Sequence, residues 1–260
     1  MSRSEPVSVM PEGSMESFRS GSLEVQVYRS RPEMAAAAAA AVAGEIRRLI
    51  GDQRRAVGIF AATPSIAEFY DRLVEAPGLE WTSVIGFHLG EHLGREESAP
   101  DSSRRFLIER LVKRVPLAEF HGVRGEAANP QAVCANYAAL LRSRPPDWAV
   151  LEIGRDGSLA YLPPALCDFD DPEMVRLVEA ELDGESRGAL TLTIPAIMAC
   201  RNLFVMGSGV ERREAVVEML NGEIVTGCPA SILRTHPAAR LFLDAQAASR
   251  LSAGNSDWGS

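Results

Sequence analysis

One polar loop in this sequence has the residue types and the position that chemistry requires. The apolar run from Trp148 to Ile153 is typical of a buried strand, and it ends at Gly154-Arg155-Asp156-Gly157-Ser158. Ligands of open α/β sheets bind beyond the carboxyl ends of the strands. We therefore expect Asp156 at the centre of a catalytic or binding site, with Gly157 and Ser158 beside it.

Glu152 interrupts this apolar run just before the loop. A carboxyl group buried on a strand beside a site has a raised pKa and could act as an acid. A Glu152 that faces solvent or forms an ion pair would instead be structural. Both interpretations are open, and Glu152 is a candidate catalytic residue.

A second polar segment, His88-Leu89-Gly90-Glu91-His92, follows the predicted strand from Trp81 to Phe87. Imidazole titrates near neutral pH and shuttles protons, so His92 and Glu91 are candidate catalytic residues. Alternatively, His88 and His92 are structural residues at a helix start or an interface. A third interpretation is a metal held by His88, Glu91 and His92 on one helical face, but no further ligand is identifiable and we predict no metal site.

A third segment, Ala61-Ala62-Thr63-Pro64, follows a predicted strand at residues 56–60. Thr63 is suited to cap the next helix and Pro64 to occupy its first position. A strand, a tight turn and a helix N-terminus together form an anion site. We expect Ala61, Ala62 and Thr63 to bind a phosphate group; the alternative is that Thr63 and Pro64 merely start a helix.

The elements that would position these loops predict one α/β domain. With 260 residues, of which 46% are hydrophobic, the chain is long enough for one large core. Predicted strands alternate with amphipathic helices, which favours a single-domain, Rossmann-like parallel sheet flanked by helices. The predicted organisation is a disordered arm at 1–21, the domain at 22–251 and a polar tail at 252–260.

Composition limits the classes of partner. The net charge of -8 and the scattered arginines argue against a nucleic-acid partner. The four cysteines lack metal-ligand spacing, so we expect reduced thiols in the cytoplasm. The N-terminal residues lack an apolar signal segment, and the alanine run at 35–43 is too short to span a membrane, so no membrane association is expected.

The loop at Asp156 resembles the signature G-x-G-x-D-G-H-x-A-F-N-E/D-P of the glucosamine-6-phosphate deaminase/6-phosphogluconolactonase superfamily. Gly154, Asp156 and Gly157 match this signature, whereas Ser158 replaces its histidine and Pro163 its acid. The segments A-L-T-L-T-I-P at 189–195 and P-A-S-I-L-R-T-H at 229–236 are similar to the deaminase branch. The resemblance implies a sugar-phosphate isomerase/deaminase type of fold.

Other motifs of the deaminase branch are altered. Its F-N-x-D-E-Y-x-G segment begins with the base that moves a proton between the sugar carbons, and Gly90 stands in place of that base. Glu91 matches the second acid and His92 replaces the tyrosine. The phosphate-binding lysine of the family's G-x-x-K is replaced by Val210, with Arg212 nearby to supply charge. Most of the family's lid insertion is missing between Met174 and Arg187.

The resemblance therefore implies a diverged deaminase/isomerase-like protein that acts on or binds an amino-sugar or sugar phosphate in carbohydrate metabolism. It implies no cofactor, and a homo-oligomer is a further expectation. An inactive sugar-phosphate-binding or regulatory module is the alternative, and a 6-phosphogluconolactonase-like hydrolase is the third hypothesis. The candidate site residues are Asp156, Glu91, His92 and Glu152 for catalysis, and Ala61, Ala62, Thr63, Gly157, Ser158 and Arg212 for binding.

Overall fold

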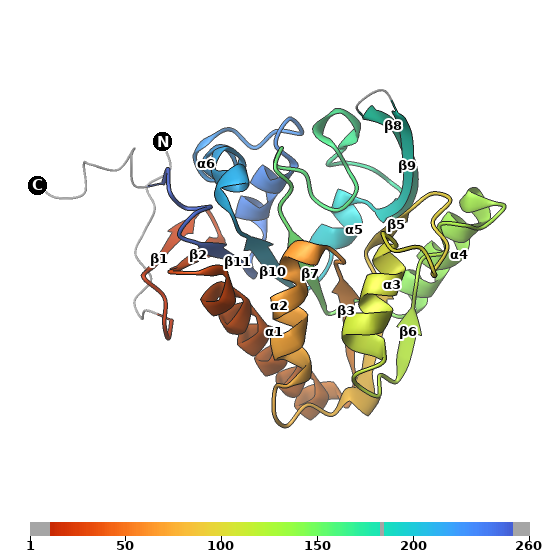
Figure 1. Ribbon diagram of the computed structural model, residues 1–260, viewed down its shortest axis with the longest axis horizontal. Helices are drawn as coiled ribbons and strands as arrows, with labels where there is room; N and C mark the ends of the chain where they lie inside the picture. The colour runs from red at the N-terminus through yellow and green to blue at the C-terminus, as the bar shows by residue number, and fades with distance from the viewer. Residues whose placement is uncertain (1–10, 183–184, 252–260) are drawn as a thin grey trace, which may run out of the picture.

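An eight-stranded sheet forms the centre of the computed structural model, which describes residues 11–182 and 185–251 (Figure 1). β1 pairs antiparallel with β2, and the other neighbours in the sheet are parallel. The prediction of a mostly parallel sheet flanked by helices is confirmed. In spatial order the strands are β1 (Glu16–Ser20), β2 (Leu23–Tyr28), β11 (Ala239–Asp244), β10 (Asn202–Gly207), β7 (Trp148–Glu152), β3 (Ala56–Phe60), β4 (Val84–His88) and β6 (Glu119–His121).

The helices lie between these strands in the chain. Parallel neighbours require crossover connections, and these are right-handed, so the direction of each crossover decides which face its helix covers. The first three helices accordingly cover one face and the last three the other. They are α1 (Arg31–Gln53), α2 (Ala67–Val74), α3 (Ser103–Leu107), α4 (Pro130–Ser143), α5 (Ile194–Met198) and α6 (Arg213–Asn221).

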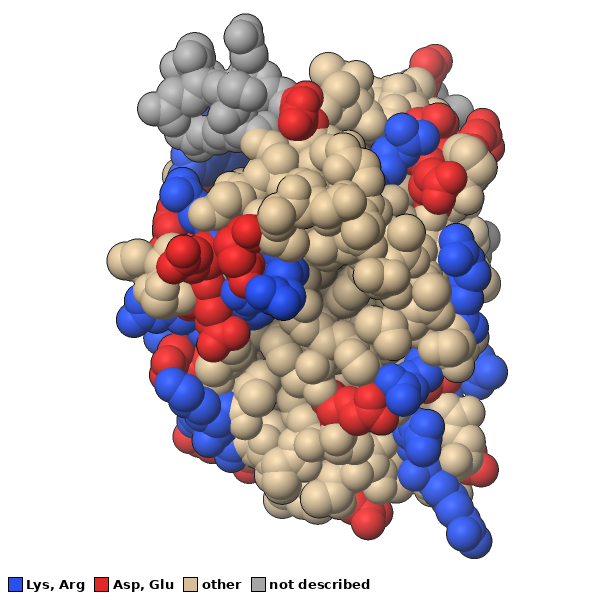
Figure 2. Space-filling view, turned by 90° about the vertical axis from the view of Figure 1, so that its right-hand side faces the viewer, with Lys and Arg blue, Asp and Glu red and all other residues tan. Residues whose placement is uncertain are grey.

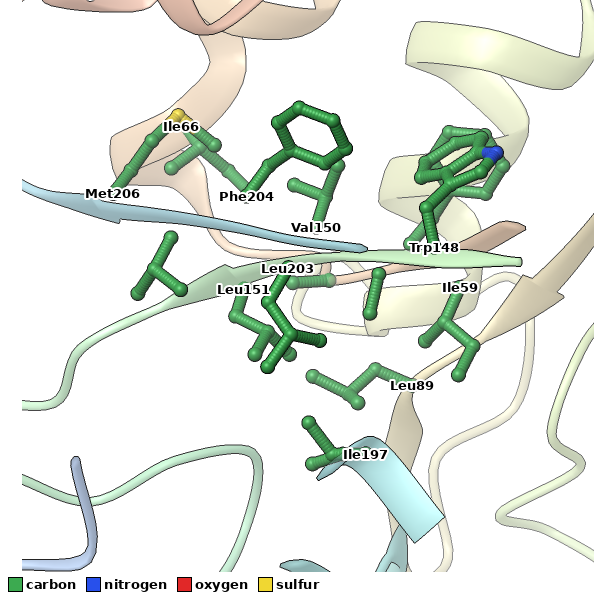
Figure 3. Close-up of a cluster of buried hydrophobic side chains, with 14 of the residues drawn as sticks. Ile59, Ile66, Leu89, Trp148, Val150, Leu151, Ile197, Leu203, Phe204 and Met206 are labelled. Carbon is green, nitrogen blue, oxygen red and sulfur yellow. The ribbon is translucent and has the colours of Figure 1, made fainter. Parts of the chain in front are cut away.

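Both faces of the central strands are buried. In Figure 3, Trp148 and Val150 of β7 point to one face, together with Phe204, while Leu151 points to the other face, toward Ile197 of α5. Strands covered on both faces read as continuous apolar runs, which is why Trp148 to Leu151 shows no polar alternation. The Trp148 indole lies so close to β3 that a β-carbon at position 58 would be 2.1 Å from its Cζ2, and glycine occupies that position.

The switch point of the large sheet lies between β3 and β7. The chain leaves β3 toward β4 on one side, whereas β7 lies on the other side of β3 and leads to β10. The loops after β3 and β7 therefore diverge to opposite faces of the sheet. Such a topological switch point is the usual ligand site of an open α/β sheet. The loops at Thr63 and Asp156 both begin here.

A smaller antiparallel sheet stands beside the carboxyl end of β4. It contains β5 (Gly90–His92), β9 (Glu185–Leu192) and β8 (Val175–Leu182), in that order. Leu89 alone separates β5 from the end of β4, so the small sheet continues directly from the carboxyl edge of the large one. A β-hairpin thus occupies the part of the chain where the sequence lacks the family's longer insertion.

Two sequence interpretations differ from the structure. The arm predicted through Gly21 contains β1, because Gly21, with a φ of 60°, closes a hairpin that pairs Glu16–Ser20 with β2. The helix start that was one alternative for His88 and His92 is not formed, because His88 ends β4 and His92 ends β5. Residues 1–10 and the predicted tail at 252–260 lie outside the described residues.

Charged side chains are mixed on the face that carries α4. Figure 2 shows Lys and Arg in small groups beside Asp and Glu around an uncharged centre, without one basic block on this face. A nucleic-acid footprint would require clustered positive charge. Among the described helices, none combines the length and the apolar content needed to cross a bilayer.

Candidate functional site

The loop after β7 is held in one tight conformation. The Gly154 amide donates to the Ser158 carbonyl at 2.9 Å, and the Ser158 amide donates to Asp156 Oδ1 at 3.0 Å. Gly157 has a φ of 79°, and a β-carbon there would lie 2.8 Å from the Cys228 Sγ. The loop therefore needs glycine at 157, and it presents the exposed Asp156 side chain on a fixed backbone.

A pocket of about 180 Å³ lies between this loop and the small sheet. Asp156, Ser158 and His92 supply its polar groups, and the ring of Tyr161 supplies much of one wall. The His92 and Tyr161 rings stand edge to face with centroids 4.9 Å apart. The remaining lining residues are small or apolar: Ala160, Leu162, Pro163, Val178, Gly188 and Ala189.

Tyr161 is a neutral hydrogen-bonding group of this pocket. Burial raises the pKa of its hydroxyl, and that hydroxyl forms a hydrogen bond with the Ser103 hydroxyl at the start of α3. The residue stands at the phenylalanine position of the family's loop signature. Because the hydroxyl is tied to Ser103, the ring is fixed as a wall of the pocket.

Position 90 has no room for a side chain. In the deaminase motif that this segment resembles, this position holds the proton-shuttling base. Gly90 is paired with Thr191 in the small sheet. A β-carbon on Gly90 would lie 2.6 Å from the Leu190 carbonyl oxygen and 2.7 Å from Cδ2 of Tyr161. The loss of the base is therefore built into the packing around Gly90.

Glu91 is buried and serves the backbone. Its carboxylate accepts hydrogen bonds from the Ser102 hydroxyl at 2.7 Å and from the amides of His92, Ser103 and Arg104 at 2.8–3.2 Å. These bonds satisfy donors at the first turn of α3, which otherwise lack partners. The structure places Glu91 away from the pocket lining, and we do not retain it as a candidate for catalysis.

The two histidines of this segment occupy different environments. His92 lines the pocket with Asp156, whereas His88 is fully buried and both of its ring nitrogens lack hydrogen-bond partners. Burial, with a smaller contribution from the nearby Arg104 charge, lowers the pKa of His88 to about 3. His88, Glu91 and His92 do not converge, and the described residues contain no group of three side chains suited to a metal ion.

At the switch point, two of the predicted phosphate-binding residues, Thr63 and Arg212, contact a carboxylate of the same chain. Thr63 does not cap the following turn; its hydroxyl donates to Glu152 Oε2 at 2.5 Å. Arg212 Nη2 donates to Glu152 Oε1 at 2.9 Å. The amide of Ala61 donates to the Val150 carbonyl, which leaves it unavailable to an anion. Glu152 thus forms an ion pair with Arg212, which was one of the two interpretations that the sequence left open.

The position of Arg212 could have been found in the sequence. Counting G-x-x-K from Gly209 instead of Gly207 places Arg212, a cation, at the lysine position. The structure supports this register, because Arg212 reaches the end of β7 and donates from Nε to the Ile153 carbonyl at 2.7 Å. Among the predicted site residues, His92, Asp156, Gly157 and Ser158 therefore lie in or beside one pocket, whereas Thr63 and Arg212 contact Glu152.

The fold defines a class of α/β protein with a mostly parallel sheet and a pocket at its carboxyl edge, and comparisons with known proteins identify the family. The family model for glucosamine-6-phosphate isomerases/6-phosphogluconolactonase matches residues 29–242. A glucosamine-6-phosphate deaminase of Lactococcus lactis subsp. lactis (strain IL1403) is 28% identical over 218 residues, which cover 80% of this chain and 92% of that protein. The chain belongs to the glucosamine-6-phosphate isomerase/6-phosphogluconolactonase family.

Solved structures agree with this fold. A monomeric glucosamine-6-phosphate deaminase superposes with a TM-score of 0.79 at 23% identity, covering 86% of this chain and 98% of that one. A 6-phosphogluconolactonase from Trypanosoma brucei superposes with a TM-score of 0.77 at 20% identity, covering 87% of this chain and 98% of that one. At these identities the likeness establishes the fold and does not separate the two activities.

Proposed function

We propose that this protein binds a sugar or sugar phosphate in the pocket beside Asp156 and does not carry out the deaminase reaction of its relatives. The observation that supports this proposal is that the pocket at Asp156 is present, whereas position 90 has no room for the side chain of a base. Asp156, Ser158 and His92 line one pocket, while the surroundings of Gly90 exclude a carboxylate. General acid–base groups contribute roughly a hundred- to ten-thousandfold to such reactions, so their loss removes most turnover.

The pocket suits the hydroxyl groups of a small sugar. Asp156 Oδ1 accepts from the Ser158 amide, and the exposed carboxylate retains lone pairs that can accept from ligand hydroxyls. The Ser158 hydroxyl can donate or accept, and the Tyr161 ring offers an apolar face. A volume of about 180 Å³ lies below the roughly 300–1,000 Å³ of common ligand pockets, which favours a ligand no larger than a monosaccharide.

A rebuilt catalyst is the second candidate. His92 and Asp156 line the same pocket, so an imidazole and a carboxylate lie beside one bound ligand. Such a pair could move a proton without the missing base at position 90. Turnover that requires both side chains would favour this candidate over a binding protein.

Thermal unfolding with ligands tests the proposed binding. We expect saturable stabilisation by glucose, glucosamine or their 6-phosphates, because a ligand that binds only the folded state raises its stability. At a hundredfold excess over Kd the gain is about 2.7 kcal/mol, or a Tm rise of roughly 5–10 °C. Asp156→Asn should weaken binding about tenfold, because it removes a charged hydrogen-bond acceptor.

The matched control is Asp170→Asn. Asp170 is an exposed aspartate that lies, like Asp156, between β7 and β8, but it does not line the pocket. This variant should bind as the unchanged protein does. The proposal fails if none of these sugars raises the Tm, or if Asp156→Asn and Asp170→Asn have the same effect.

A further inference from the structure

A carboxylate of the chain itself occupies the anion position at the switch point. Donors from two loops converge on Glu152: the Thr63 hydroxyl after β3 at 2.5 Å, and the Arg212 guanidinium after β10 at 2.9 Å. Hydroxyl and guanidinium groups arranged in this way are typical partners of a phosphate or carboxylate. Here the end of β7 supplies the anion.

The Arg212 guanidinium is held by the main chain independently of Glu152. Arg212 Nε donates to the Ile153 carbonyl and Nη1 to the Ser208 carbonyl, both at 2.7 Å. The Arg212 side chain is 10% exposed and that of Glu152 is 7% exposed. The cation is therefore preorganised and largely out of water, where an anion partner matters far more than at the surface.

The charges at this position exclude a further anion. Glu152 and Glu211 both pair with Arg212, at 2.9 Å each, so two carboxylates face one guanidinium. A phosphate monoester carries about -1.5 to -2 charges at neutral pH. It would have to displace the buried Glu152 carboxylate and would then meet excess negative charge.

We propose that Glu152 is a built-in substitute for the phosphate group of a ligand, so that this protein selects sugars without a phosphate at the switch point. The carboxylate satisfies Thr63 and Arg212 permanently, and removing it converts the same donors into a phosphate site. The ligand class, a neutral or amino monosaccharide, rests on the proposed function. The exclusion of phosphate by Glu152 does not.

Titration with inorganic phosphate tests the proposal without any sugar. We expect no saturable binding by the unchanged protein, measured by calorimetry and by the rise in Tm at constant ionic strength. Glu152→Ala should bind phosphate at least about tenfold more tightly, because the freed guanidinium and hydroxyl gain a partner. Phosphate should also recover part of the Tm that this variant loses. The control Glu214→Gln removes an exposed carboxylate from α6, the helix that begins directly after Arg212. This variant should gain no phosphate binding.

Two further variants fix the interpretation. Adding Arg212→Met to Glu152→Ala should abolish the gained phosphate binding. Glu152→Gln keeps the shape of the side chain and removes its charge. This variant should also bind phosphate about tenfold more tightly than the unchanged protein. It replaces Glu152→Ala in the test if Glu152→Ala does not fold. Phosphate binding by the unchanged protein that equals that of the folded variants would overturn the proposal, and so would no gain in a folded variant.

The outcomes separate this inference from the proposed function. Gained phosphate binding in the Glu152 variants, with no sugar bound by any protein, would leave Glu152 as the substitute anion and refute the sugar pocket. Saturable sugar binding at Asp156, with phosphate binding unaffected by Glu152, would do the reverse.

Discussion

Gly90→Asp, which returns a carboxylate to the position of the family's base, is expected to destabilise the protein by about 3 kcal/mol or more and to restore no ammonia release. Its β-carbon would lie within 3 Å of the Leu190 carbonyl and the Tyr161 ring, and its charge would enter a buried strand. The free energy of unfolding in urea measures the first effect. Incubation with glucosamine 6-phosphate measures the second.

The matched control for this change is Gly44→Asp. Gly44 is exposed within α1, and a β-carbon there has no neighbour within 4 Å. Gly and Asp are both poor helix formers, so this variant should stay within about 0.5 kcal/mol of the unchanged protein. A Gly90→Asp variant as stable as Gly44→Asp would show that the base position is open after all.

The unfolding free energy should depend steeply on pH through His88. Its pKa is about 3 in the folded protein and 6.5 in the unfolded chain, so the unfolded chain binds the proton more readily. The contribution of neutral His88 is complete above pH 6.5 and decreases as the pH falls toward 3. At pH 5 the free energy of unfolding should therefore be about 2 kcal/mol lower than at pH 7 through His88 alone.

His88→Leu isolates this contribution. Both ring nitrogens of His88 lack partners, so an apolar residue of similar size leaves no donor or acceptor unsatisfied. Urea unfolding of both proteins at pH 8, 7 and 5 should give equal differences between pH 8 and 7. Between pH 7 and 5 the free energy of unfolding should fall by about 2 kcal/mol less in the variant than in the unchanged protein. Equal losses in the two proteins would refute a neutral, buried His88.

Local sequence patterns were enough to predict the central strands. The predicted strands at 56–60 and from Trp148 are β3 and β7, and parallel strands buried on both faces have no polar alternation. The small sheet could not be predicted in this way. β5 pairs with β9 about a hundred residues later, and three residues such as Gly90–His92 carry no periodicity.

The same contrast applies to the site. Asp156 was predicted because a strand, a tight turn and a family signature all lie within one short segment. The bond between Glu152 and Arg212 joins residues 60 positions apart, so the sequence left Glu152 open between an acid and an ion pair. Glu91 matched the second acid of the family motif, and the sequence could not show that its carboxylate accepts hydrogen bonds at the start of α3.

Ammonia release from glucosamine 6-phosphate tests most directly whether this family member has given up the deaminase reaction. We expect no release above the uncatalysed rate, with the Lactococcus lactis relative as a positive control. Saturable release by the unchanged protein, reduced about a hundredfold or more in Asp156→Asn, would show that other side chains of the pocket, such as His92, have replaced the missing base.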